Sequence, residues 1–130
     1  MIKQLSIFLE NRAGQLADIT GVLYEKNINM MALNIAETAS YGVLRVIVRE
    51  TDEAMAALKE AGYIVSVSDV VGVHVPDEPG GLHKVLRILA DNDIDVEYMY
   101  SVFSLREGQA YMIFKVEDPE KAEKLIGDKK

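Results

Sequence analysis

The sequence of 130 residues contains no cysteine, only two histidines and no long apolar run. The absence of cysteine excludes disulfides and thiolate metal sites, and it is typical of cytoplasmic proteins. A membrane-spanning helix needs about 20 predominantly apolar residues, which no segment provides. The N-terminal residues also lack the apolar core and the small-residue cleavage site of a secretory signal peptide. We therefore expect a cytoplasmic protein in which few side chains are available for catalysis or metal binding.

The charge of the chain argues against nucleic-acid binding. Asp and Glu number 21 against 14 Lys and Arg, so the formal net charge is −7. A surface of that sign repels a phosphate backbone. Hydrophobic residues make up 49% of the chain and charged residues 27%, which are values of a folded globular protein. The length fits one ordinary domain or two very small ones.

The chain carries an internal duplication. The segment ENRAGQLADIT at 10–20 and the segment PDEPGGLHKVL at 76–86 both place a short polar run, a Gly and a Leu before an apolar-periodic stretch. The same offset of 66 residues places Asn27-Ile28-Asn29 on Asp93-Ile94-Asp95. A period this long, repeated twice, favours two small tandem domains, which we place at 1–69 and 70–130.

The first repeat shows a change of hydrophobic period along its length. Leu5, Ile7 and Leu9 alternate with polar or outward residues, which predicts a half-buried strand. From Gly14 onward the apolar residues follow helical spacing. The expected elements are, in order, a strand at 2–9, a helix from 14, a hairpin over 29–49, a helix at 53–61 capped by Thr51-Asp52, and a strand at 63–68. This order is the β-α-β-β-α-β unit of the ferredoxin-like fold.

The second repeat follows the first but ends early. Its expected elements are a strand near 70–75, a helix at 80–91, hairpin strands at 95–105 and 108–116, and a helix at 118–126. No residues remain for a fourth strand, so the strand at 71–75 has an open edge. Either the linker region 63–75 is shared between the repeats, or another subunit covers the edge. We predict an α+β fold of two ferredoxin-like repeats packed side by side, the second without its last strand, and a homodimer.

The loop E-N-R-x-G-x-L, followed 18 residues after its Asn by Asn29 in I-N-M, resembles the ACT domain. ACT domains are small amino-acid-binding regulatory domains of enzymes in amino-acid metabolism. The chain is similar to two such domains in tandem. Its first repeat resembles the ACT domains of phosphoglycerate dehydrogenase and of the acetolactate synthase regulatory subunit. The resemblance implies that a ligand binds where two repeats pair, between the first loop of one and the start of the second strand of the other.

The resemblance assigns two loops and two strand positions to ligand binding. The loops comprise Asn11, Arg12, Ala13, Gly14, Gln15 and Leu16 in the first repeat, and Asp77, Glu78, Pro79, Gly80, Gly81 and Leu82 in the second; the strand positions are Asn29, Met30, Asp95 and Val96. Paired repeats would join Asn11 to Asp95 and Asp77 to Asn29, so each site would hold one amide and one carboxylate.

The chemistry of a free amino acid suits these loops. Its carboxylate needs N–H donors, which a helix N-terminus supplies together with a favourable dipole. Its ammonium group needs a carboxylate or a carbonyl group. Gly14 and Gly80 would let a ligand approach the backbone, and Pro79 would preset the first helical turn. Two other interpretations remain open: that Asn11 and Asp77 are only helix N-caps, and that the two glycines serve only close packing.

We predict a non-catalytic sensor of a free amino acid that regulates amino-acid metabolism, with no cofactor. The alternative is a regulatory subunit that acts by contact with an enzyme such as acetolactate synthase. An enzyme is a weaker interpretation, because the sequence lacks a nucleophile–base pair, a metal cluster and a phosphate loop. His83 beside Asp77 and Glu78 lacks a spacing that fixes metal geometry, so we predict no metal site.

Overall fold

The computed structural model describes residues 1–10, 12–37, 41–102, 104 and 106–128. The elements in chain order are β1 (Ile2–Glu10), α1 (Gln15–Glu25), β2 (Met30–Glu37), β3 (Tyr41–Val48), α2 (Thr51–Glu60), β4 (Val65–Pro76), α3 (Gly81–Asp91), β5 (Val96–Val102), β6 (Gln109–Val116) and α4 (Pro119–Ile126). The predicted order of strands and helices is confirmed in both repeats, and so is the α+β class with two ferredoxin-like repeats.

The chain divides into two compact units, Lys3–Ser68 and Asp69–Lys130, the second of which also includes Met1–Ile2. Strand β4 is a single strand of 12 residues that serves both repeats. Its first part is the fourth strand of the first repeat, and its second part is the first strand of the second repeat. The interpretation of a shared linker region is therefore the one that the structure supports. The limits 1–69 and 70–130 stay a proposal, because β4 is continuous across the boundary between them.

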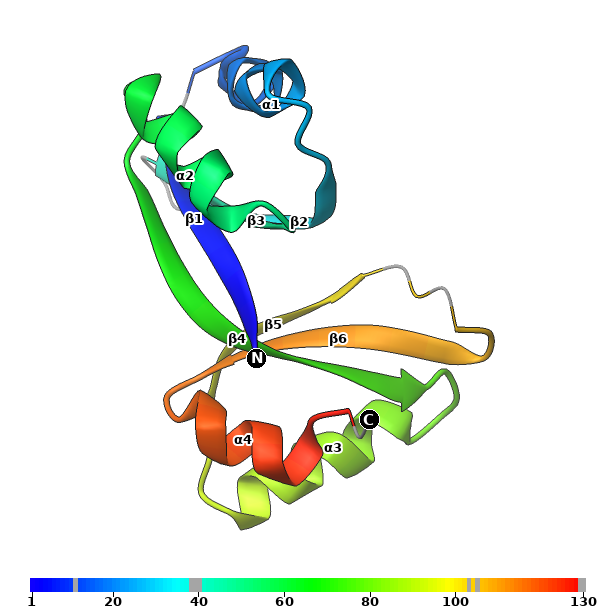
Figure 1. Cartoon of the computed structure of the whole chain (residues 1–130). Coiled ribbons are helices and arrows are strands. Elements are labelled where there is room, and N and C mark those ends of the chain that lie inside the picture. The colour runs from blue at the N-terminus through cyan, green and yellow to red at the C-terminus, as the bar shows by residue number, and fades with distance from the viewer. Residues whose placement is uncertain (11, 38–40, 103, 105, 129–130) are drawn as a thin grey trace. The chain divides into compact units, whose positions relative to one another are not determined.

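In the first unit the strands occur in the order β2-β3-β1-β4, and β3 is antiparallel to both β1 and β2. Helices α1 and α2 cover one face of this sheet (Figure 1). The predicted alternation along β1 is confirmed, because its odd-numbered apolar residues enter the core. The buried core of this unit is formed by Leu5, Ile7, Leu9, Ile19, Leu23, Ile28, Leu44, Val46, Val48, Ala54, Leu58 and Val65.

In the second unit the strand order is β4-β6-β5, and β6 is antiparallel to both neighbours. Helices α3 and α4 cover one face of this sheet (Figure 1). The core comprises Val71, Val73, Val75, Leu89, Ile94, Met112, Phe114, Val116, Ala122 and Ile126. Among residues 106–128 and the other described ranges, no strand takes the place of a fourth strand in this repeat, as the sequence predicts.

Asp128 lies against the edge of β4 where that strand would pair. The carboxylate of Asp128 accepts a hydrogen bond from the backbone N–H of His74 at 2.8 Å, and its other oxygen lies 2.6 Å from Nδ1 of the same residue. Burial alone would raise the pKa of Asp128, but the two hydrogen bonds with His74 outweigh it and the pKa is lowered. A side chain thus satisfies a backbone donor that would otherwise face an empty edge.

One expectation for a helix end is corrected. Helix α2 begins at Thr51 and has Glu50 at its cap position, so Thr51 and Asp52 lie in the first turn instead of capping it. The helix predicted at 118–126 is observed as α4, and its Ala122 and Ile126 are buried in the core of the second unit.

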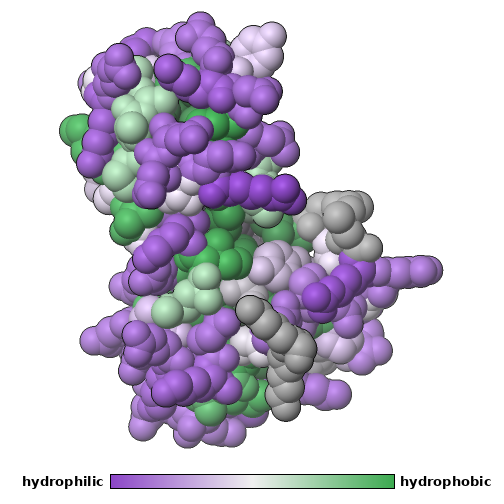
Figure 2. Space-filling model, viewed as in Figure 1, coloured by the Kyte–Doolittle hydropathy of each residue, from purple (hydrophilic) through white to green (hydrophobic). Residues whose placement is uncertain are grey.

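Hydrophilic residues cover most of the face shown in Figure 2, in keeping with the charge content of the chain. None of the helices in the described part of the chain is both long and apolar enough to cross a membrane.

Candidate functional site

Both predicted loops lead into a helix through a glycine in the left-handed region. Gly14 has φ 85° and holds the cap position of α1, and Gly80 has φ 90° and holds that of α3. A residue with a side chain rarely adopts this conformation, whereas glycine does so at no steric cost. An ideal Cβ at either glycine would meet nothing within 4 Å. The packing interpretation is therefore wrong, and backbone conformation is what requires these glycines.

The cap positions also show that the N-cap interpretation is wrong for Asp77. Gly80 is the N-cap of α3, and no side chain accepts a hydrogen bond there, so Asp77 is not the N-cap. Asn11 lies outside the described residues. Among the residues that the structure describes, none caps helix α1 with its side chain either. The first N–H groups of an uncapped helix need acceptors from elsewhere, and an anionic ligand can supply them.

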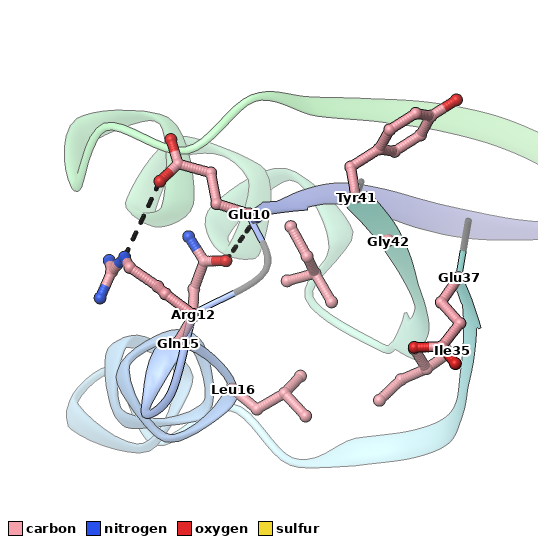
Figure 3. A pocket seen from close by; sticks show the side chains of 9 residues that line it. Glu10, Arg12, Gln15, Leu16, Ile35, Glu37, Tyr41 and Gly42 are labelled. Atoms are coloured by element: carbon pink, nitrogen blue, oxygen red, sulfur yellow. Dashed lines mark hydrogen bonds and ion pairs between the residues drawn. The ribbon is translucent and has the colours of Figure 1, made fainter. Parts of the chain in front are cut away.

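A hollow of about 210 Å³ opens beside the start of α1 (Figure 3). It is lined by Leu9, Glu10, Arg12, Gln15, Leu16, Ile35, Glu37, Tyr41 and Gly42. These residues come from the end of β1, the start of α1, the end of β2 and the start of β3. Its volume is below the ~300–1,000 Å³ of sites for drug-sized ligands, so it suits a small metabolite.

Strand pairing brings the separate segments of the hollow together. Leu9 pairs with Gly42, and Glu10 pairs with Tyr41, along β1 and β3. Glu37 at the end of β2 also pairs with Gly42. The end of β2 and the start of β3 therefore lie next to the end of β1, as the split β-α-β order requires.

The hollow has an apolar wall and a charged rim. Leu16 on α1 and Ile35 on β2 are 41% and 45% exposed, and Figure 3 shows both side chains extending into the gap between the two elements. On the rim, Arg12 lies 3.8 Å from Glu10 and 3.7 Å from Asp18. Both ion pairs are exposed to solvent and contribute little to stability, so they can open without much loss when a ligand binds.

Gln15 is the buried polar residue of the hollow. The residue is only 6% exposed. Its Oε1 accepts a hydrogen bond of 2.6 Å from the backbone N–H of Glu10. Its Nε2 amide group has no protein acceptor among the described residues. Figure 3 shows this side chain between the end of β1 and the start of α1.

The structure brings together only part of the predicted first-repeat set. Arg12, Gln15 and Leu16 line the hollow, with Ala13 and Gly14 in the exposed turn that joins them. Asn29 and Met30 lie at the opposite end of β2; Asn29 is exposed, and Met30 packs against the core of its unit. The pairing of Asn11 with Asp95 and of Asp77 with Asn29 stays a prediction.

The predicted residues of the second repeat are arranged differently. Helix α3 begins at Gly81, so Pro79 precedes the helix and does not preset its first turn. Leu82 and Val96 pack against the core of the second unit. Glu78 and Asp77 are exposed in the turn. Asp95 lies in another hollow, lined by Asp93, Ile94, Asp95, Glu117, Asp118 and Lys121.

Sequence reasoning missed the residues that close the hollow from the far side: Leu9, Glu10, Ile35, Glu37, Tyr41 and Gly42. A signal for them was present, because the predicted β-α-β-β order already places the turn of the hairpin beside the end of the first strand. No group of three or more His, Cys, Asp or Glu suited to a metal ion occurs in the described part of the chain.

Comparisons with known proteins agree with the fold. A family model described as an ACT domain pair matches residues 1–130. A crystal structure of a protein from Bacteroides thetaiotaomicron is 43% identical, with 95% of this chain and 85% of that chain covered and a TM-score of 0.89. The ligand-free regulatory subunit of aspartate kinase from Thermus thermophilus is 18% identical, with 95% and 89% covered and a TM-score of 0.69. The corresponding subunit from Thermus flavus is 16% identical, with 96% and 91% covered and a TM-score of 0.63. Among curated proteins, no sequence matches.

Proposed function

The chain belongs to the family of ACT domain pairs, a regulatory family, and on this premise we propose that it is a non-catalytic sensor that binds a free amino acid. The observation that carries the proposal is the hollow beside α1, which combines an uncapped helix N-terminus, charges of both signs and an apolar wall. We place the protein in the cytoplasm, as a regulator of amino-acid metabolism.

Each part of a zwitterionic ligand has a complementary group at this hollow. The ligand carboxylate fits the N–H groups at the start of α1 and the guanidinium group of Arg12, which are donors with positive charge or partial charge. The ligand ammonium group fits the carboxylates of Glu10 or Glu37. The ligand side chain would then lie against Leu16 and Ile35. A neutral apolar molecule would leave these charged groups unused.

Titration calorimetry with each of the twenty amino acids tests the proposal. We expect heat and a saturable isotherm from at least one of them, at micromolar to millimolar concentration. The full chain is the sample, and the amino-acid amides, which lack the carboxylate, are the matched controls and should bind more weakly. Absence of binding by all twenty would overturn the proposal.

A second candidate function, regulation by contact with an enzyme, is favoured by the surface of β2. This strand is at the end of the strand order, and Met31, Leu33 and Ile35 on it are exposed. An apolar strand at a sheet edge is a surface that proteins usually cover. The cover would be a metabolic enzyme, such as the acetolactate synthase that the sequence resemblance suggests, or a second copy of this chain.

Two measurements separate these partners. Light scattering of the purified chain over a range of concentrations should give the mass of a homodimer. A monomer mass at all concentrations would exclude the second copy. Affinity purification from native cytosol should then recover an enzyme of amino-acid metabolism in a fixed ratio. If no such enzyme is recovered, the proposal of regulation by contact with an enzyme is overturned.

A further inference from the structure

The two loops share one backbone design, but their side chains differ at a pair of coupled positions. We propose that the amino-acid site lies in the first repeat alone, that Gln15 binds the ligand carboxylate there, and that the ligand has an aliphatic side chain. This inference rests on the proposed function. It assigns the function to one of two pseudo-equivalent loops and gives Gln15 a role that the sequence resemblance does not single out.

Two backbone features occur in both loops. The N–H of Arg12 donates to the carbonyl of Glu10 at 2.9 Å, and the N–H of Glu78 donates to the carbonyl of Pro76 at 2.9 Å. The left-handed glycine follows at the same place in each. The clearest difference between the loops lies in the side chains that the turns carry.

The coupled positions are the last residue of the first strand and the first residue of the helix. In the first repeat, the N–H of Glu10 donates to the Gln15 side chain. In the second repeat these positions are Pro76 and Gly81. Proline has no N–H, so it offers nothing to a side-chain acceptor. A Cβ on Gly81 would overlap the carbonyl oxygen of Pro76, so this loop has closed onto the helix and leaves no room for a side chain.

Gln15 offers the donor that an anionic ligand needs. Its residue is more than nine-tenths buried, its Oε1 is fixed by Glu10, and its Nε2 group has no acceptor among the described residues. Fixing the oxygen also fixes the orientation of the amide, so the donor is held in place before a ligand arrives. A ligand carboxylate at the start of α1 would accept a hydrogen bond from this donor.

The charges around the two loops reinforce this difference. Arg12 in the first loop is replaced in the second by Glu78, which lies beside Asp77. Two carboxylates repel a ligand carboxylate, whereas a guanidinium group binds one. The second loop therefore lacks both the amide donor and the cation.

The wall of the hollow selects the ligand side chain. Leu9, Leu16 and Ile35 supply its apolar surface. Such a wall stabilises an aliphatic side chain by burial, at about 25 cal/mol per Å² of apolar surface. A charged side chain of the ligand would lose its water against this apolar surface, which disfavours it. The corresponding position to Ile35 in the second repeat is Ser101, which removes part of the wall there.

The experiment is calorimetry with the full chain and L-leucine, L-isoleucine and L-valine, with L-aspartate and L-lysine for contrast. We expect one molecule of an aliphatic amino acid bound per chain. The variant Gln15→Glu keeps an acceptor for the Glu10 N–H but replaces the donor with a negative charge. It should weaken binding by roughly tenfold to a hundredfold. Gln109→Glu, which adds the same charge at an exposed position of β6, should bind within twofold of the parent protein.

The outcomes distinguish this inference from the function on which it rests. Two molecules per chain, preference for a charged amino acid, or undiminished binding by Gln15→Glu would overturn the inference and leave an amino-acid sensor. No binding by any of the twenty amino acids would overturn both. If Gln15→Glu unfolds, Arg12→Gln serves in its place, because Arg12 is exposed and its loss spares the fold. Unchanged binding by Arg12→Gln would likewise overturn the inference.

Discussion

Removal of the Asp128 carboxylate should destabilise the second repeat, because this group is what closes the free edge of β4. The substitution Asp128→Ala removes two contacts with His74, one of 2.8 Å to the backbone N–H and one of 2.6 Å to the ring. A hydrogen bond to a charged group contributes ~1.5–3 kcal/mol. The Asp128 side chain is 30% exposed, and water replaces part of what is lost. We therefore expect a loss of about 1 kcal/mol in the free energy of unfolding.

The variant Asp128→Asn separates the contribution of the negative charge from that of the hydrogen bond to the backbone. Its amide oxygen still accepts from the backbone N–H of His74, but the negative charge is gone. We expect about half of the loss seen with alanine. Urea unfolding at pH 7, followed by circular dichroism, measures both variants. Asp91→Asn is the control, because Asp91 is paired with Arg87 only through an exposed contact one helical turn away. Its cost should be ~0.3–0.5 kcal/mol or less.

The pH dependence supplies a second, independent test. The pKa of Asp128 is lowered in the folded protein, since the hydrogen bonds with His74 outweigh burial. A group with a lowered pKa stabilises the folded state above its unfolded pKa of ~3.9, and this stabilisation is lost as the pH falls through the folded pKa. The difference between the parent protein and Asp128→Asn should therefore be constant near neutral pH and shrink below about pH 4. If Asp128→Ala is as stable as the parent protein, water satisfies the β4 edge and our account of it is refuted.

Three further substitutions test other parts of the fold by urea or thermal unfolding. Gly80→Ala should destabilise by about 1 kcal/mol because φ is 90°, whereas Gly21→Ala, inside α1 with open space around it, should stabilise by ~0.5–1 kcal/mol; equal effects would contradict the role of φ. Leu58→Ala, at a fully buried position, should cost ~2–5 kcal/mol, and a cost below 1 kcal/mol would contradict the core assignment. Burial, followed by the Asp128 charge, raises the pKa of Tyr111, so stability should fall as the pH rises above ~10, and Tyr111→Phe should remove that fall.

The regular part of the fold could be predicted from the sequence because period is a strong signal. The alternation of Leu5, Ile7 and Leu9 places them in the core, and the helical spacing after Gly14 predicts α1. The continuity of strand β4 was harder to predict. Two β-rich stretches on either side of Asp69 give the same pattern whether they form two strands or one. The strands that pair with β4 on its two sides decide between one strand and two, and these strands are distant in the sequence.

The capping errors have a local physical cause. A Thr-Asp pair before a helix is a favoured N-cap sequence, yet Glu50 holds the cap position and α2 begins at Thr51. Propensity fixes a helix start to within about one turn, and packing of the apolar face fixes the remainder. At Pro79 the same uncertainty made a turn residue resemble a first-turn residue.

The candidate site was only half predictable for a similar reason. Loop residues adjacent in sequence, such as Arg12 and Leu16, were found because one motif contains them. Ile35 and Glu37 were missed because the motif directs attention to the start of β2, whereas the hollow uses its end. The pairing of β2 with β3 determines which end of the strand meets the loop, and the predicted topology contains that information.

The conformation of the loop glycines also decides which substitution can test the site. A bulky residue at Gly14 would be expected to block a ligand if the only role of glycine were to leave space. Because φ is 85° there, any side chain also strains the backbone, so lost binding would not distinguish a blocked site from a distorted helix start. Gln15→Glu avoids this ambiguity. The residue has ordinary helical geometry, the change is nearly isosteric, and the hydrogen bond from the Glu10 N–H retains its acceptor. Pro76 has no N–H to donate and Gly81 has no side chain to accept, so the second repeat lacks this contact altogether, and the Gln15→Glu test addresses the first repeat alone.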